Sequence, residues 1–289
     1  MRTLVFCFLL QLVMGVGACS RHQPQAPVGE LRLQFSSEPA SVDPSLAEDG
    51  LALKILSNTA EGLVGFSGQG KLIGLGATSW KVSPDGKEIR FSLNPRRHWS
   101  DGVPLVADHF KIGIDRSRDP RTGAKLGAML EPIDSVMAPS ADTLIIKLKR
   151  KTPYFVQVLS LPVGAPQRAD ILAANEGRWP ANAPGSGRYW IRQRIRDQAW
   201  RLELNSHYGE ALAPGAPQSV SLIFVSEENT AFVLFEQGRI DVLGRVPVYE
   251  VERLKKQGLI HQAPYWATYY VGFNTRSAAL KDARLRCFL

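Results

Sequence analysis

Alternating apolar and polar residues recur in short stretches along this chain. The segment Leu31–Phe35 (LRLQF) alternates as a strand with one buried and one exposed face does. Trp80 and Val82 alternate before the turn Ser83–Gly86, and Ile89–Leu93 alternates after it, which predicts a β-hairpin. Similar patterns predict further strands at Thr143–Leu148, Tyr189–Arg194, Arg201–Leu204, Val220–Val225, Ile240–Leu243 and Ala267–Phe273.

Apolar residues with helical spacing lie between the predicted strands. The first such segment runs from Leu51 to Glu61, and Gly62 is expected to stop it. Three more helices are predicted at Ala107–Arg116, from a cap at Ser226 to Gly238, and from Pro247 to Gly258. Because strands and helices mix throughout and no internal repeat is present, the pattern predicts an α/β fold with α+β mixing.

The first residues have the pattern of an export signal. Arg2 is followed by the almost wholly apolar segment Leu4–Val16, which is shorter than the ~20 residues that a membrane-spanning helix needs. Val16-Gly17-Ala18-Cys19 then resembles the bacterial lipobox, in which the cysteine is acylated after cleavage. We therefore predict a lipid anchor on Cys19; the alternative is an ordinary signal with a chance cysteine.

Composition mainly excludes other classes of protein. The 289 residues are 44% hydrophobic and 21% charged, as in a globular protein of two domains or one large domain. The net charge of +8 is spread over short runs such as Lys149–Lys151, without a nucleic-acid-binding motif, so we expect no nucleic-acid partner. Cys7 and Cys19 lie in the signal, which leaves Cys287 unable to form an internal disulfide.

No motif typical of catalysis is present. Gly185-Ser186-Gly187 lacks the flanks of a nucleophile elbow, and Gly74-Leu75-Gly76 lacks the third glycine of a dinucleotide-binding loop. The five histidines show no metal-ligand spacing. We therefore expect no enzyme, no metal site and no cofactor.

Several segments occur in an order that is typical of one family. Ser83–Leu93 (SPDGKEIRFSL) followed by His98–Gly102 (HWSDG) is the most recognisable stretch. The others are Ser41–Pro44, Glu61–Val64, Gly74–Trp80, Gly185–Tyr189, Gly238–Asp241, Tyr269–Thr275 and Asp282–Arg286. Together they resemble the extracytoplasmic solute-binding proteins of oligopeptide and dipeptide ABC transporters, family 5. One departure is Val106, which replaces a threonine ahead of a helix and predicts a missing N-cap.

The resemblance implies periplasmic-binding-protein-like type II lobes. Residues 1–19 would be a lipoprotein signal peptide and 20–30 a tether. Residues 31–62 and 186–271 would form a split lobe I, 63–185 lobe II, and 272–289 the start of an incomplete lobe III. Because family members continue into a whole third lobe, we expect a truncated chain.

The resemblance also implies a ligand site. In the family, lobes close around a solute, the main chain of a peptide pairs with strand edges, and its ammonium group meets a carboxylate of the third lobe. The matching edge is Ala47–Gly50, which makes Glu48, Asp49 and Gly50 candidate ligand-binding residues; a plain surface loop is the alternative. Tyr269 and Tyr270 lie on the predicted strand between lobes, where they would line the cavity or pack in the core.

The resemblance thus implies a substrate-binding lipoprotein of an ABC importer. It would bind di- or oligopeptides between lobes and deliver them to the permease subunits, as a monomer on the periplasmic or cell-surface side of a bacterial membrane. The alternatives are a nickel, haem or other small-solute binder of the same family, or a non-functional truncated remnant. Without a whole third lobe, we expect the chain to bind peptides very weakly or not at all.

Overall fold

The computed structural model describes residues 29–262 and 270–288. The chain divides into two compact units, Met1–Val246 and Pro247–Leu289, and each is described separately. The signal segment, Cys19 and Tyr269 lie outside the described residues. No described helix is long and apolar enough to cross a membrane.

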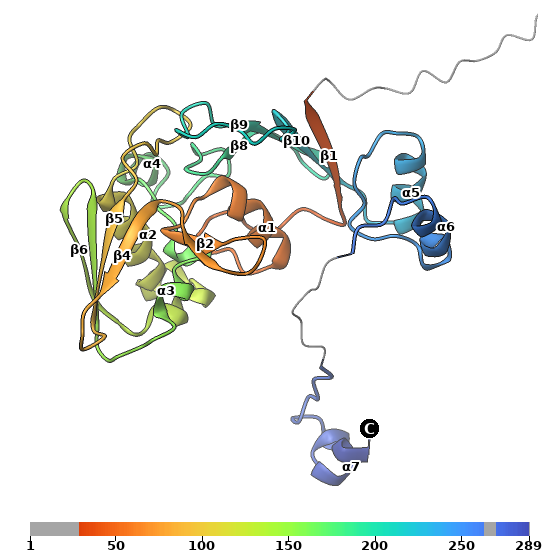
Figure 1. The fold of residues 1–289 in the computed structure, drawn as a ribbon. Coiled ribbons are helices and arrows are strands. Elements are labelled where there is room, and N and C mark those ends of the chain that lie inside the picture. The colour runs from red at the N-terminus through yellow and green to blue at the C-terminus, as the bar shows by residue number, and fades with distance from the viewer. Residues whose placement is uncertain (1–28, 263–269, 289) are drawn as a thin grey trace, which may run out of the picture. The chain divides into compact units, whose positions relative to one another are not determined.

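One four-stranded sheet of the first unit brings together distant parts of the sequence. Its order is β1 (Glu30–Phe35), β10 (Ser219–Phe224), β9 (Ala199–Leu204) and β8 (Tyr189–Ile195) (Figure 1). β1 and β10 are parallel, with Leu33 opposite Leu222, and the other pairs are antiparallel. Helix α1 (Gly50–Thr59) buries Ala52, Ile55, Leu56 and Thr59. Apolar residues of α1 and the sheet share one core.

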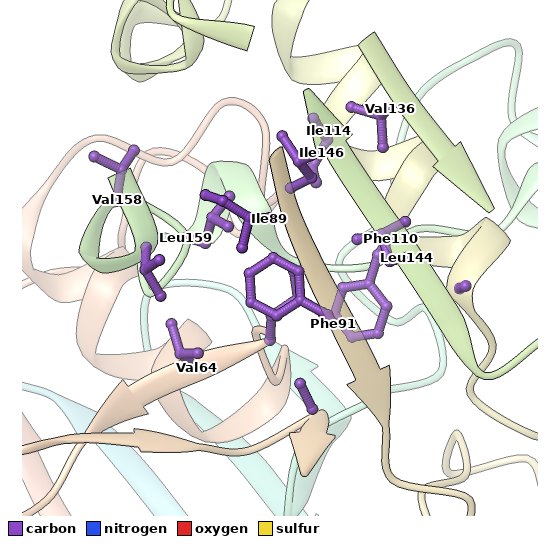
Figure 2. Close-up of a cluster of buried hydrophobic side chains, with 14 of the residues drawn as sticks. Val64, Ile89, Phe91, Phe110, Ile114, Val136, Leu144, Ile146, Val158 and Leu159 are labelled. Atoms are coloured by element: carbon purple, nitrogen blue, oxygen red, sulfur yellow. The ribbon is translucent and has the colours of Figure 1, made fainter. Parts of the chain in front are cut away.

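A second four-stranded sheet has the order β4 (Ala77–Val82), β5 (Glu88–Leu93), β7 (Thr143–Leu148) and β6 (Ile133–Ser140). Strand β5 alternates between buried and exposed residues as its sequence predicts, and Gly86 in the hairpin turn has a φ of 72°. Helix α2 (Ala107–Arg118) and the short α3 (Phe155–Val158) pack with this sheet; Figure 2 shows Phe110 of α2 near Leu144 of β7.

Shorter elements complete the first unit. Strands β2 (Val64–Phe66) and β3 (Leu72–Gly74) form a separate pair. The remaining helices are α4 (Ala169–Ala174), α5 (Glu228–Glu236) and 3-10 turns at Pro120–Thr122, Lys125–Leu130 and Pro162–Gly164. In the second unit, a 3-10 turn at Val248–Glu250 follows Pro247 and leads into α6 (Val251–Lys256); Ala278–Leu280 is a further 3-10 turn before α7 (Ala283–Phe288).

Several predicted element boundaries are wrong. Helix α1 ends at Thr59 with Ala60 as its C-cap, before Gly62. Helix α5 is capped by Glu227 rather than by Ser226, because the Glu227 carboxylate accepts hydrogen bonds from the backbone N–H groups of Asn229 and Thr230. Residues 240–243 form only one parallel bridge, between Val242 and Leu33, instead of a strand. Of the strand predicted at 267–273, residues 270–273 are not extended into a sheet, and the rest lie outside the described residues.

Two buried polar clusters join the regions around the two sheets. In the first, Arg97 lies 2.7 Å (Nε to Oε1) from Glu61, and the Tyr208 hydroxyl donates to the same carboxylate. In the second, Arg116 makes two hydrogen bonds of 2.7 Å to Asp43. Burial raises the pKa of Glu61, and the Arg97 guanidinium opposes that rise. Because a buried charge is costly without its partner, these clusters fix the contact between the two regions.

The N-terminus of α2 confirms the predicted missing cap. Val106 has no side-chain capping bond. Instead the Nδ1 atom of His109 accepts hydrogen bonds from the Val106 backbone N–H and from Trp99 Nε1–H, both at 3.2 Å. Both bonds require an unprotonated Nδ1, so the proton of the neutral ring is on Nε2. Burial, and next the charge of Arg168, lower the pKa of His109.

We expect this histidine to make the chain less stable in mild acid. As the pH decreases through about 6.5, the unfolded chain takes up a proton at this position before folded His109 does, so the stability decreases as the pH decreases, by at most about 1.4 kcal/mol per pH unit. Urea unfolding at pH 7 and pH 5 measures the fall. A His109→Gln variant, whose amide oxygen can accept the same bonds, should lose this component, whereas exposed His207→Gln should keep it. Equal pH dependence in His109→Gln and the parent would show this explanation to be wrong.

Candidate functional site

The predicted edge Glu48–Gly50 leads directly into α1. Asp49 is the N-cap of this helix, with extended backbone angles (φ −88°, ψ 153°). Its Oδ1 atom accepts hydrogen bonds from Leu51 N–H at 3.0 Å and from Ala52 N–H at 2.8 Å. The Asp49 carboxylate therefore caps the helix, and at a ligand site Asp49 would act through its backbone.

The backbone of this segment is open. Within the described residues, the N–H groups of Glu48, Asp49 and Gly50 have no hydrogen-bond acceptor, and the carbonyl groups of Ala47 and Glu48 have no donor. Gly50 is exposed, and a Cβ atom placed on it would meet nothing within 4 Å. These groups resemble the unpaired edge of a sheet, which an extended peptide can pair with.

The Glu48 side chain is not free. Its Oε1 atom lies 2.7 Å from Nζ of Lys125, which comes from the 3-10 turn at Lys125–Leu130. Both side chains are substantially exposed, so the pair adds at most about 1 kcal/mol to stability. The Glu48 carboxylate is nevertheless paired with Lys125, so it is not an unpaired anion that could bind a ligand.

A cavity of about 420 Å³ lies at the carboxyl ends of the parallel strands β1 and β10. Residues Leu51 and Lys54 of α1 line it, so it directly follows the open segment. Its other lining residues are Leu33, Gln34, Phe35, Ser36, Ser226, Glu228, Ala231, Val242, Gly244 and Arg245. In open α/β sheets, ligand crevices occur outside the carboxyl ends of parallel strands, which makes this cavity the best candidate for a ligand pocket.

Sequence reasoning missed the cavity residues. Lys54, Ser226 and Arg245 are far apart in the chain, and only the pairing of β1 with β10 brings their elements together. The sequence did contain one signal for the cavity, the ends of the two predicted strands at Phe35 and Val225. If these strands are parallel neighbours, their ends lie at the same edge of the sheet, where ligand crevices occur.

Two other cavities are less suited to a solute. One of about 20 Å³, lined by Trp99, Trp179 and Ile191 among others, has room for little more than a water molecule. The other, of about 380 Å³, lies by the C-terminal end of α2, near Arg118 and Lys149. Neither is lined by Leu51, the residue that follows the candidate segment Glu48–Gly50 and that lines the larger cavity.

The two candidate tyrosines lie outside the first unit, which contains this cavity. Tyr270 is 86% exposed, in a segment without strand structure in the second unit, and Tyr269 lies outside the described residues. Cys19 also lies outside them. Among residues 29–262 and 270–288, no three side chains of His, Cys, Asp or Glu gather as a metal site would require.

Comparison with known proteins identifies the family of this chain. Residues 71–287 match the sequence model described as "Bacterial extracellular solute-binding proteins, family 5 Middle". The chain is 29% identical over 283 residues to the periplasmic murein peptide-binding protein MppA of Escherichia coli K12, covering 90% of this chain and 52% of MppA. It is 26% identical over 284 residues to the probable deoxycholate-binding periplasmic protein YgiS of the same organism, covering 91% of this chain and 53% of YgiS.

The solved structure of the E. coli murein tripeptide-binding protein MppA superimposes with a TM-score of 0.80 at 28% identity, covering 89% of this chain and 54% of that one. The predicted fold class is thereby confirmed. The chain spans about half the length of these relatives. The match covers most of the chain, and the family consists of extracytoplasmic binding proteins rather than enzymes. This chain therefore belongs to the bacterial extracellular solute-binding proteins of family 5.

Proposed function

We propose that this chain binds di- or oligopeptides and delivers them to the permease subunits of an ABC importer. The observation that carries the proposal is the open backbone of Glu48, Asp49 and Gly50 beside the cavity at the ends of β1 and β10. Main-chain pairing at such an edge gives affinity without selecting a peptide sequence, while a pocket takes the side chains. The family, and the murein peptide in the name of its member MppA, support a peptide ligand.

The lobe division predicted from the sequence is part of the proposal. Lobe I comprises residues 31–62 and 186–271, lobe II residues 63–185, and residues 272–289 begin a third lobe. The two separate apolar clusters support the first two lobes: one draws its buried residues from Leu63 to Val163, and the other from Val42 to Leu56 and Tyr189 to Leu222. Tyr269 and Tyr270 remain proposed ligand contacts.

Main-chain pairing can be tested by removing a single backbone N–H group. Gly50 is the first residue of α1, and Asp49 before it is extended, so proline fits at this position. The Gly50 N–H has no acceptor in the protein, so Gly50→Pro removes a donor without breaking an internal hydrogen bond. We expect unchanged or higher thermal stability, and peptide binding about three- to tenfold weaker, as the loss of one hydrogen bond of about 1 kcal/mol implies.

Gly50→Ala is the matched control, because it adds a side chain in open space and keeps the N–H. Binding of a di- to pentapeptide pool, measured by equilibrium titration of both variants, should weaken only in Gly50→Pro. If both variants bind as the parent does, main-chain pairing at this edge is wrong.

We further propose that the chain is held at a bacterial membrane through a lipid on Cys19. The apolar segment and Val16-Gly17-Ala18 before this cysteine support the assignment. Cells fed a fatty-acid analogue should label the parent chain, and Cys19→Ala should lose both the label and its place in the membrane fraction. A Cys7→Ala variant, altered within the signal, should still be labelled. Labelling of Cys19→Ala at the parent level would refute the anchor.

A further inference from the structure

The charged residues that line the cavity at the ends of β1 and β10, called its rim below, do not balance in charge. Lys54 and Arg245 line it with one acidic residue, Glu228. In the part of the chain that the structure describes, none of these three side chains has an ion-pair or hydrogen-bond partner. The nearest helix caps, Asp49 and Glu227, direct their carboxylates to backbone N–H groups of α1 and α5. Among the described residues, the cavity thus has two cationic side chains without a paired carboxylate and one acidic side chain, Glu228.

The backbone that carries Arg245 is fixed against β1. Asp241 binds Arg32 through two side-chain hydrogen bonds, at 3.0 Å to Nε and 2.7 Å to Nη2. Gln34 N–H then donates to the Val242 carbonyl at 3.0 Å, and Gly244 N–H donates to Gln34 Oε1 at 3.1 Å. Arg245 follows this anchored segment directly, so its backbone is held beside the cavity that its side chain lines.

Lys54 reaches the cavity from helix α1. It lies three residues after Leu51, and residues at this spacing share a face of a helix. Five apolar residues also line the cavity, and they are called its floor below: Leu33, Phe35, Leu51, Ala231 and Val242. An apolar floor with cations on the rim suits a solute that carries an anionic group next to an apolar one.

We propose that this cavity binds a carboxylate of the solute through Lys54 and Arg245, and the adjoining apolar group through its floor. The proposal rests on the solute binding proposed above and names the class of solute: a peptide, or another small molecule, with a free carboxylate beside an apolar side chain. The carboxylate can be the peptide's C-terminus or an acidic side chain, since both present the same two oxygens.

The test uses two probes of almost equal shape, 3-phenylpropionate and 3-phenylpropionamide, which differ in charge. The full chain in non-ionic detergent is titrated with each, and amide resonances of the cavity residues are followed. We expect the carboxylate to bind about tenfold more tightly than the amide. The double variant Lys54→Gln/Arg245→Gln should lose this preference. The double variant Lys71→Gln/Arg239→Gln removes the same charge from exposed positions outside the cavity and should keep it.

Equal affinity for the two probes, or a preference that survives in Lys54→Gln/Arg245→Gln, would overturn the carboxylate site. A parallel titration with Ala-Ala-Phe and its C-terminal amide separates this failure from failure of the proposed function. Equal binding of both peptides would contradict the carboxylate site but support peptide binding. Binding of 3-phenylpropionate without binding of either peptide would contradict peptide binding and retain the carboxylate site.

Discussion

Replacing Arg97 by alanine is expected to lower the free energy of unfolding by about 3–5 kcal/mol, the usual cost of removing one partner from a buried ion pair. The side chains of Arg97 and Glu61 are only 4% and 5% exposed. Arg97 also contacts Glu210 at 2.9 Å, and its guanidinium lies 4.0 Å from the centre of the Tyr208 ring. Without Arg97, the Glu61 carboxylate would stay buried with the Tyr208 hydroxyl as its remaining side-chain partner.

Urea unfolding measures this loss, and Arg96→Ala is the matched control. Arg96 is exposed, so its removal should change stability by less than about 0.5 kcal/mol. Adding Glu61→Gln to Arg97→Ala should recover part of the loss, because the stranded charge is then gone. If Arg97→Ala is as stable as Arg96→Ala, the buried pair does not hold this junction.

The second large effect is expected at Asp43, in the Asp-Pro segment before α1. Its carboxylate accepts two hydrogen bonds of 2.7 Å from Arg116 and one of 3.0 Å from the Ser45 backbone N–H. Asp43→Ala should lower the free energy of unfolding by about 3 kcal/mol, the lower end for a buried pair. The reason for the lower end is that Arg116 keeps the Gln167 side chain and the Gly177 carbonyl as acceptors.

Asp115→Ala provides the comparison on the same helix. Asp115 pairs with Lys111 at 2.7 Å, but both side chains are about two-fifths exposed, and such a pair contributes at most about 1 kcal/mol. Urea unfolding should therefore give a much lower free energy of unfolding for Asp43→Ala than for Asp115→Ala. Equal stability of the two would show that burial of Asp43 does not strengthen its pair with Arg116.

The strands were largely predictable because one face of each sheet is buried. Thr143–Leu148 has the predicted bounds, and the hairpin of β4 and β5 turns at Asp85-Gly86 as expected. In these segments the alternation of apolar side chains and the turn residues indicate the same structure. Helix α2 was also placed correctly, although it continues to Arg118, beyond the predicted Arg116.

Features that depend on distant contacts were not predictable. Residues 240–243 have the composition of a strand, but they lie beside β1 with a single bridge, a hydrogen bond that Arg32 donates to Asp241, and one that Gln34 Oε1 accepts from the N–H of Gly244. Glu227 and not Ser226 caps α5, since its carboxylate accepts hydrogen bonds from the backbone N–H groups of Asn229 and Thr230, an outcome that cap preferences alone do not give. His109 at the uncapped start of α2 is a similar case.

The candidate site likewise has one part that the sequence indicated and one part that depends on distant contacts. Resemblance to a family pointed to Glu48, Asp49 and Gly50, and the segment has open backbone groups; their role in binding stays a prediction. The cavity beside them, with Lys54 and Arg245, follows from the parallel pairing of β1 and β10 across nearly the whole first unit. No local pattern in the sequence encodes that pairing.

The central claim is that this chain pairs with the main chain of a peptide along Glu48–Gly50. The most direct measurement is an NMR titration of the isotope-labelled chain with a mixed pool of di- to pentapeptides. We predict saturable shifts of the Glu48, Asp49 and Gly50 amide resonances, with a Kd of about 1 mM, or about −4 kcal/mol, since a peptide on one open surface stays partly solvated. Absence of shifts at these three amides, or saturable shifts confined to other parts of the chain, would contradict the claim.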